Sequence, residues 1–85
     1  MKGGPKIQPQ DEVKRLDVKG LVCPYPEMLT LEALEKLSSG HLLIVRTDNP
    51  PSVEAIPHKV QSRGHRVEKL LEIEKGVWEI YIRKG

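Results

Sequence analysis

A nearly continuous apolar run, residues 41–47 (HLLIVRT), constrains the fold of this chain more than any other feature. A strand exposed to water on one face alternates apolar and polar residues, whereas a strand covered on both faces is apolar almost throughout. The run therefore predicts a central strand that is buried on both faces or nearly so. The segments before and after it must supply the neighbouring strands and the helices.

The residues before this run predict a strand and then a helix. Residues 13–18 have strand character and end at Gly20. Residues 28–37 carry apolar side chains at three- and four-residue steps, which is the period of a helix. We expect this helix to begin at about Pro24 and to end at Gly40, a residue suited to a left-handed cap.

The residues after the run indicate a turn and a second, weaker helix. Residues 48–52 (DNPPS) have turn chemistry, and helical spacing continues from Ser52 to about Ser62. Pro57 falls inside this pattern. We therefore expect the second helix to be kinked or to start late.

The last part of the chain predicts an antiparallel hairpin. Residues 66–74 (RVEKLLEIE) and 77–83 (VWEIYIR) are two strands joined by a short Lys-Gly turn. In the second of these strands Trp78, Ile80 and Ile82 fall on one side. We expect that side to face the core and the opposite side to be wetter.

The predicted order of elements is therefore β-α-β-α-β-β. A right-handed crossover places both helices on the same side of the sheet. The expected fold class is an α/β (α+β) two-layer sandwich, with a four-stranded mixed sheet and two helices on one face. Residues 13–85 form this single domain, and residues 1–12, rich in Gly, Pro and Gln, are expected to form a flexible N-terminal tail.

Composition excludes several classes of protein. The chain has 14 basic and 12 acidic residues, a weak case for direct binding of nucleic acid. It has no secretory signal and no apolar run of the roughly 20 residues that span a membrane, so we expect a cytoplasmic protein without membrane insertion. His41, His58 and His65 lack metal-ligand spacing, and one cysteine cannot form a disulfide or a CxxC pair. We expect no metal and no cofactor.

The chemistry is concentrated at Cys23, the only cysteine. It precedes the first turn of the first predicted helix, where unpaired N–H groups and the helix dipole favour a thiolate over a thiol. Pro24 and Pro26 are tolerated in a first turn and fix the entry to the helix. This placement favours an exposed, partly ionised nucleophile. The alternative is a small buried apolar side chain, the commoner role of a lone cysteine.

The stretch Leu16–Pro26 (LDVKGLVCPYP) resembles the N-terminal signature of the TusA/SirA (YedF-type) sulfur-carrier family, in which Cys-Pro-x-Pro opens the first helix. Further similar positions are Gly40, the Asp48-Asn49-Pro50 turn, Pro57 and the closing Ile82-Arg83-Lys84-Gly85. The resemblance covers about residues 13–85. It implies the same β-α-β-α-β-β sandwich.

The resemblance also implies a function. Cys23 would accept persulfide sulfur from a cysteine desulfurase or another sulfur donor protein and relay it to a downstream sulfur-acceptor protein. Relatives serve tRNA 2-thiouridine synthesis, in which tRNA is reached only indirectly, molybdenum cofactor assembly, sulfur oxidation or selenium metabolism. Pro24 and Pro26 would shape the site, and Asp48 would help to dock a partner. Such a protein is a sulfur-transfer carrier rather than a self-sufficient enzyme.

Three other charged residues are candidates for partner docking. Glu27 departs from the family pattern, and a carboxylate near the sulfur is expected to oppose thiolate formation and to alter which partner docks. Lys59 and Arg63 belong to a modest basic stretch that is either a solvated face or a docking surface for an acidic partner or tRNA. His58, on the second helix, is a possible base for Cys23 that no pattern in the sequence supports.

Two other functions remain open at this point. One is a small RNA- or protein-binding regulatory module in which the cysteine is structural. The other is a redox adaptor in which Cys23 forms a mixed disulfide with a partner.

Overall fold

The structure is a computed structural model that describes residues 13–85, so the tail expected over residues 1–12 lies outside the described residues. Six elements follow one another: β1 (Val13–Asp17), α1 (Tyr25–Glu35), β2 (Leu42–Thr47), α2 (Pro50–Ser62), β3 (Arg66–Glu74) and β4 (Val77–Arg83). The predicted order is confirmed, and the two hairpin strands have the expected bounds.

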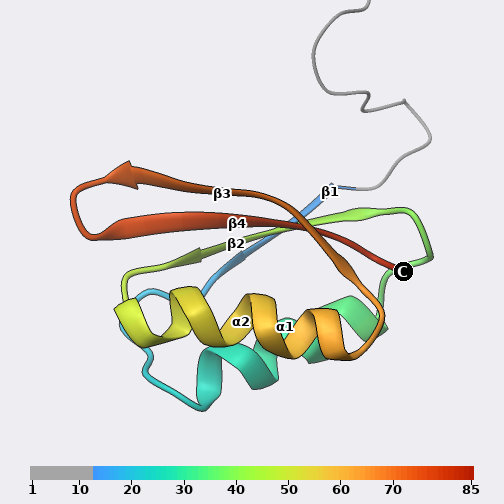
Figure 1. The fold of residues 1–85 in the computed structure, drawn as a ribbon, viewed down its shortest axis with the longest axis horizontal. Coiled ribbons are helices and arrows are strands. Elements are labelled where there is room, and N and C mark those ends of the chain that lie inside the picture. The colour runs from blue at the N-terminus through green and yellow to red at the C-terminus, as the bar shows by residue number, and fades with distance from the viewer. Residues whose placement is uncertain (1–12) are drawn as a thin grey trace, which may run out of the picture.

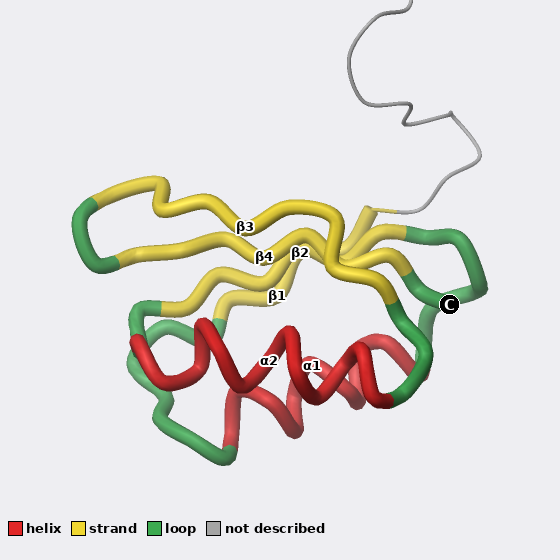
Figure 2. The backbone as a smooth tube through the Cα atoms, viewed as in Figure 1, coloured by secondary structure: helices red, strands yellow, loops and turns green. Residues whose placement is uncertain are grey.

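The four strands form one mixed sheet in the order β1-β2-β4-β3. β1 and β2 are parallel, whereas β4 pairs antiparallel with both β2 and β3. Both helices cover the same face of this sheet and leave the other face open (Figures 1 and 2). The structure thus confirms the two-layer sandwich with two helices on one face.

The core lies between the sheet and the two helices, and β2 runs through its middle. Every residue of β2 except Arg46 is buried, as the apolar run predicted. The apolar side chains of the core are Val18, Leu34, Leu37, Leu43, Val45, Ile56, Val60, Ile80 and Ile82. Neither helix in residues 13–85 has the length and apolar character needed to cross a bilayer.

Helix α1 buries only the later part of its apolar period, since Leu34 is in the core and Leu31 packs against it. Pro26, Thr30 and Leu34 are the buried residues, four positions apart along one side of the helix. Met28 and Leu29 are exposed, although they belong to the apolar period that predicts the helix. The apolar residues at the start of α1 therefore form part of the protein surface.

Helix α2 begins earlier than expected. It starts at Pro50 rather than late, and it continues through Pro57 to Ser62. Pro50 and Pro51 occupy the first turn, where a missing N–H costs no intrahelical hydrogen bond. Pro50 and Pro51 therefore begin the helix and are not confined to the turn before it, and Pro26 occupies the first turn of α1 in the same way.

Gly40 and Gly76 adopt the left-handed conformation in turns between elements. Gly40 follows α1 with a φ of 89°, and Gly76 lies in the β3–β4 turn with a φ of 81°. A residue with a Cβ atom is strained there, so glycine is the residue that these positions require. Helix α1 ends at Glu35 and its C-cap is Lys36, so Gly40 belongs to the turn before β2 and the expectation that the helix runs to a left-handed cap at Gly40 is wrong.

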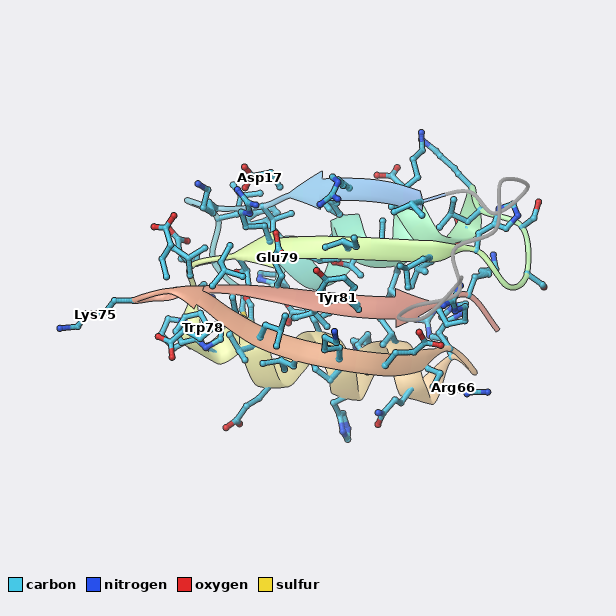
Figure 3. All side chains as sticks on the ribbon, turned by 90° about the horizontal axis from the view of Figure 1, so that it is seen from above. Asp17, Arg66, Lys75, Trp78, Glu79 and Tyr81 are labelled. Atoms are coloured by element: carbon cyan, nitrogen blue, oxygen red, sulfur yellow. The ribbon has the colours of Figure 1, made fainter. Side chains whose placement is uncertain are left out.

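The alternation of β4 holds for two of its three core positions. Ile80 and Ile82 are fully buried, but Trp78 is only partly buried. Trp78 lies near the β3–β4 turn, whose tip carries Lys75 (Figure 3). The expectation that Trp78 belongs to the core is therefore wrong.

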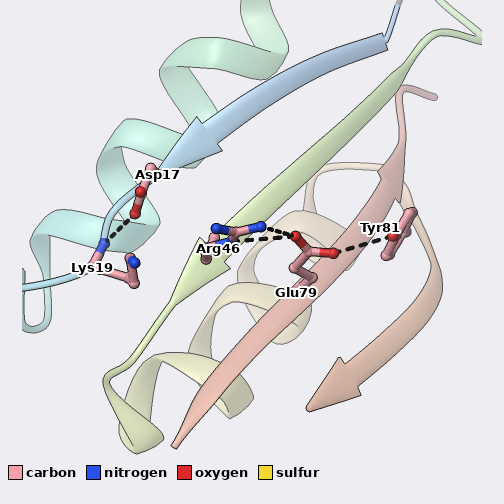
Figure 4. A network of polar contacts seen from close by, with 5 residues as sticks. All are labelled: Asp17, Lys19, Arg46, Glu79 and Tyr81. Carbon is pink, nitrogen blue, oxygen red and sulfur yellow. Dashed lines mark hydrogen bonds and ion pairs between the residues drawn. The ribbon is translucent and has the colours of Figure 1, made fainter. Parts of the chain in front are cut away.

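The open face of the sheet carries a polar network centred on Glu79. Arg46 Nη2 donates a hydrogen bond to Glu79 Oε2 at 2.8 Å, and the Tyr81 hydroxyl donates to Glu79 Oε1 at 3.2 Å (Figure 4). Glu79 is only 7% exposed, so this face is less wet than its sequence pattern predicts. The hydrogen bond from Arg46, followed by that from Tyr81, holds the pKa of Glu79 below its usual value of 4.5, against the effect of burial.

This network predicts a measurable pH dependence of stability. Because the pKa of Glu79 is lower in the folded chain than in the unfolded chain, its contribution is fully present above about pH 4.5 and is lost as the pH falls through the lower, folded value. Glu79→Gln should be less stable than the wild type at pH 7. The difference in unfolding free energy should shrink towards pH 3 in urea titrations. A difference that stays constant between these pH values would contradict this account.

A candidate thiol site where two helices begin

The topology brings the starts of both helices to one edge of the sheet. β1 and β2 are parallel, so their carboxyl ends lie at the same edge, and each strand leads into a helix there (Figure 1). Cys23 lies in the loop between β1 and α1 and is exposed. It precedes Pro24, the N-cap of α1. Exposure removes the alternative of a small, buried, structural cysteine.

Backbone and side-chain hydrogen bonds hold the cysteine loop against the end of β2. The Val18 N–H donates to the carbonyl oxygen of Arg46 at 2.8 Å. The Gly20 N–H donates to Asp48 Oδ1 at 3.0 Å, which ties this loop to the turn before α2. Asp48 therefore helps to place Cys23 beside the first turn of the second helix.

The sulfur atom of Cys23 contacts two polar side chains from that turn. Its Sγ lies 3.5 Å from Ser52 Oγ and 3.8 Å from Asn49 Nδ2. Asn49 Nδ2 also donates to Ser52 Oγ at 2.8 Å. Asn49 is the N-cap of α2, and Ser52 is fully buried in its first turn. The three side chains form a compact polar cluster.

The two prolines flank the cysteine at the start of α1. Pro24 is exposed, and the Cys23–Pro24 peptide bond is cis. Pro26 is buried in the first turn, and its carbonyl oxygen accepts a hydrogen bond from Thr30 Oγ1 at 2.7 Å. Pro26 thereby anchors the helix on the core, while Cys23 stays at the surface.

Exposed apolar side chains lie in the cysteine loop and in the first half of α1. We call this set the apolar rim; it consists of Leu21, Val22, Tyr25, Met28 and Leu29. Val22 is 59% exposed, and Tyr25 and Met28 are each 57% exposed. Exposed apolar groups gathered in one place are typical of surfaces that contact another protein.

The charged residues predicted for docking do not all lie near Cys23. Glu27 is in the first turn of α1, half-buried, and its Oε1 is buried without a hydrogen-bond partner among the described residues. Lys59 and Arg63 lie roughly 10 and 16 Å beyond Ser52 along the axis of α2. The structure thus ties Asp48 to the cysteine loop, places Glu27 in the first turn of α1 and leaves the two basic residues towards the far end of α2.

Sequence reasoning did not identify Asn49 and Ser52 as site residues. Both lie more than 25 positions from Cys23 in the sequence, so the contact depends on the parallel pairing of β1 with β2. The available signal was their place immediately after the predicted central strand. Within residues 13–85, no group of three or more His, Cys, Asp and Glu side chains is arranged to hold a metal ion.

The known proteins that this chain resembles are described as sulfur-transfer or sulfur carrier proteins. The chain matches the family model described as Sulfurtransferase TusA over residues 14–84. A Thermotoga maritima protein described as a sulfur carrier is 43% identical over 70 residues, which covers 82% of this chain and 89% of that protein. Escherichia coli TsuB, described in the same way, is 33% identical over 73 residues, covering 86% and 97% respectively.

A solved structure has the same arrangement. The crystal structure of the SirA-like protein from Desulfitobacterium hafniense superimposes with a TM-score of 0.76 at 31% sequence identity. The match covers 87% of this chain and 99% of that one. The likeness therefore extends over nearly the whole of both chains.

Proposed function

Because this chain belongs to the TusA family of sulfur carrier proteins, we propose that Cys23 accepts a sulfur atom as a persulfide from a donor protein and passes it to an acceptor protein. The observation that carries this proposal is the position of the only cysteine. Cys23 is exposed at the start of α1 and contacts polar side chains at the start of α2. A sulfur relay requires a thiol that two proteins can reach in turn.

Loading of Cys23 requires no reactant other than the persulfide of the donor protein. The Cys23 thiolate attacks the terminal sulfur of a persulfide on the donor. A bond forms between Cys23 Sγ and that sulfur, the S–S bond of the donor breaks, and the donor cysteine leaves with the electron pair as a thiolate. The transferred sulfur keeps its proton. In delivery, a thiolate of the acceptor attacks the same terminal sulfur, and Cys23 leaves as a thiolate.

The partners in this scheme are a cysteine desulfurase or another sulfur donor, and a downstream sulfur-acceptor protein. The apolar rim, in the cysteine loop and on the first half of α1, offers both of them a contact surface. Where the final product is a thiolated tRNA, the acceptor rather than the carrier binds the RNA, in keeping with the near-neutral charge of +2. A chain whose only thiol must stay reduced suits a reducing compartment such as the cytoplasm.

Mass spectrometry tests the proposal. After incubation with a cysteine desulfurase and cysteine, the protein should gain about 32 Da, the mass of one sulfur atom, and dithiothreitol should remove it. If the desulfurase carries its own persulfide while the chain gains no mass, the carrier function is wrong. Salt-dependent binding of tRNA that persists without Cys23 would then favour the RNA-binding module. A mixed disulfide with the partner would favour the redox adaptor.

The apolar rim yields a separate prediction about docking. Met28→Glu places a charge on the rim, so transfer from a donor protein should slow at least about tenfold, because residues near the centre of an interface carry most of its binding energy. Alkylation of Cys23 by iodoacetamide, which needs no docking, should not change. The matched control is Leu71→Glu, because Leu71 is an exposed leucine of β3 on the open face of the sheet. Equal transfer rates in the two variants would exclude the rim as the docking surface.

A further inference from the structure

Asn49 occupies the N-cap position of α2 but does not use its side chain for capping. An asparagine at this position ordinarily accepts a hydrogen bond from an N–H group of the first turn. In the described chain Asn49 makes no such side-chain bond; its amide donates to Ser52 Oγ and approaches Cys23 Sγ instead. Pro50 and Pro51, the next two residues, have no N–H to offer.

The same two prolines change what the start of α2 presents to the sulfur. A helix N-terminus usually binds anions through its free backbone N–H groups. Here the first two positions are prolines, and the N–H of Ser52 donates to the carbonyl oxygen of Asn49 at 2.9 Å. The donors that face Cys23 are therefore the side chains of Asn49 and Ser52 rather than the backbone.

The direction of the hydrogen bonds in the cluster suits a thiolate. Asn49 Nδ2 is a donor, so Ser52 Oγ is the acceptor in the 2.8 Å contact between them. The Ser52 proton then remains available for Cys23 Sγ at 3.5 Å. A thiolate only accepts hydrogen bonds, so both side chains act as donors towards it. Thr47 supports the arrangement, since its Oγ1 accepts the Asn49 N–H at 3.2 Å.

We propose that Asn49 and Ser52 are positioning residues for the sulfur relay: the Asn49 amide orients the Ser52 hydroxyl, and the two donors stabilise Cys23 as a thiolate. This inference rests on the proposed function, in which the thiolate is the nucleophile of loading and the leaving group of delivery. The carboxylates of the neighbourhood are Glu27 on α1 and Asp48 before α2. A carboxylate only accepts hydrogen bonds, so the donors at the sulfur are the Asn49 amide and the Ser52 hydroxyl.

Alkylation kinetics test this role without any partner protein. With iodoacetamide at pH 7, Ser52→Ala should react about threefold to tenfold more slowly than the wild type, the effect of one lost hydrogen bond. At pH 10, which is above the ordinary pKa of a cysteine of about 8.5, the rates should agree within about twofold. Asn49→Ala should show the same pattern. Asn49→Asp, which keeps the shape but replaces the amide donor by a carboxylate, should be slower at pH 7 than Asn49→Ala.

The matched control is Ser62→Ala. Ser62 ends the same helix, and its hydroxyl donates to the Lys59 carbonyl oxygen at 2.6 Å, far from the sulfur. Its alkylation rate should equal that of the wild type, and a thermal melt of each variant should confirm folding. Equal rates in folded Ser52→Ala and wild-type protein at pH 7 would overturn the inference.

The two proposals fail in different ways. If the wild type gains no sulfur, the relay is wrong, whatever the alkylation rates show. If the wild type gains sulfur but loading of Ser52→Ala and Asn49→Ala is as fast as wild-type loading, the relay stands and the positioning role is wrong. The expected result is that the variants load to the same final mass but more slowly, by the factor seen in alkylation at pH 7.

Discussion

Cys23→Ser is expected to lose sulfur loading completely. Cys23 is the only cysteine of the chain, so no other thiol can form the persulfide. A serine hydroxyl is not ionised at neutral pH, and oxygen does not replace the sulfur nucleophile in thiol exchange. After incubation with a desulfurase and cysteine, the mass of the variant should stay at its starting value, while the wild type gains about 32 Da.

The folding of this variant is the necessary control. Because Cys23 is exposed, its replacement should change the unfolding free energy by no more than about 0.5 kcal/mol. The variant should therefore still compete with the wild type for the donor protein. A persistent, reductant-sensitive gain of mass in folded Cys23→Ser would show that sulfur is held somewhere other than the thiol.

Ile80→Ala should strongly destabilise the fold. Ile80 is fully buried in β4, where it pairs with Val45 of β2 and Leu70 of β3. Truncating a buried isoleucine removes apolar contact and leaves a cavity, at a cost of about 3–4 kcal/mol. A small domain has a total stability of only about 5–10 kcal/mol. We expect a fall of more than about 10 °C in the midpoint of thermal unfolding.

Leu71→Ala is the comparison for this experiment. Leu71 is on the neighbouring strand, next to the partner of Ile80, but it is 40% exposed. Its truncation should cost less than about 1 kcal/mol, because much of the side chain is already in water. Similar losses in the two variants, measured by urea unfolding, would mean that the sheet does not bury Ile80 as described.

Most of the fold was predictable because its signals are local. The apolar run of β2, the periodic spacing of α1 and the short turn between β3 and β4 each depend on a few neighbouring residues, and these elements were found. The partial exposure of Trp78 and the start of α2 could not be predicted from neighbouring residues. They depend on how far the helices extend over the sheet and on whether adjacent prolines begin a helix or precede it.

The functional site was predictable only in part. Cys23 and its two prolines are consecutive or nearly so, and their chemistry follows from the start of a helix. The contacts of the sulfur with Asn49 and Ser52 arise from the pairing of parallel strands, which brings residues 26 and 29 positions away to the same edge. A helical apolar period likewise does not distinguish a buried face from a docking face, so the apolar rim was not expected.

The carboxyl terminus lies at the opposite end of the sheet from the sulfur. Leu42 pairs with Arg83, so Gly85 lies where β2 begins, whereas Asn49 and Cys23 lie where β2 ends. The Gly85 N–H donates to His65 Nδ1 at 3.0 Å, which holds the last residue at that end. A fluorescent dye, a resin linker or a fused enzyme attached after Gly85 would leave the thiol uncovered. The carrier is thus suited to immobilisation, and to experiments that follow one sulfur atom from donor to acceptor on a surface.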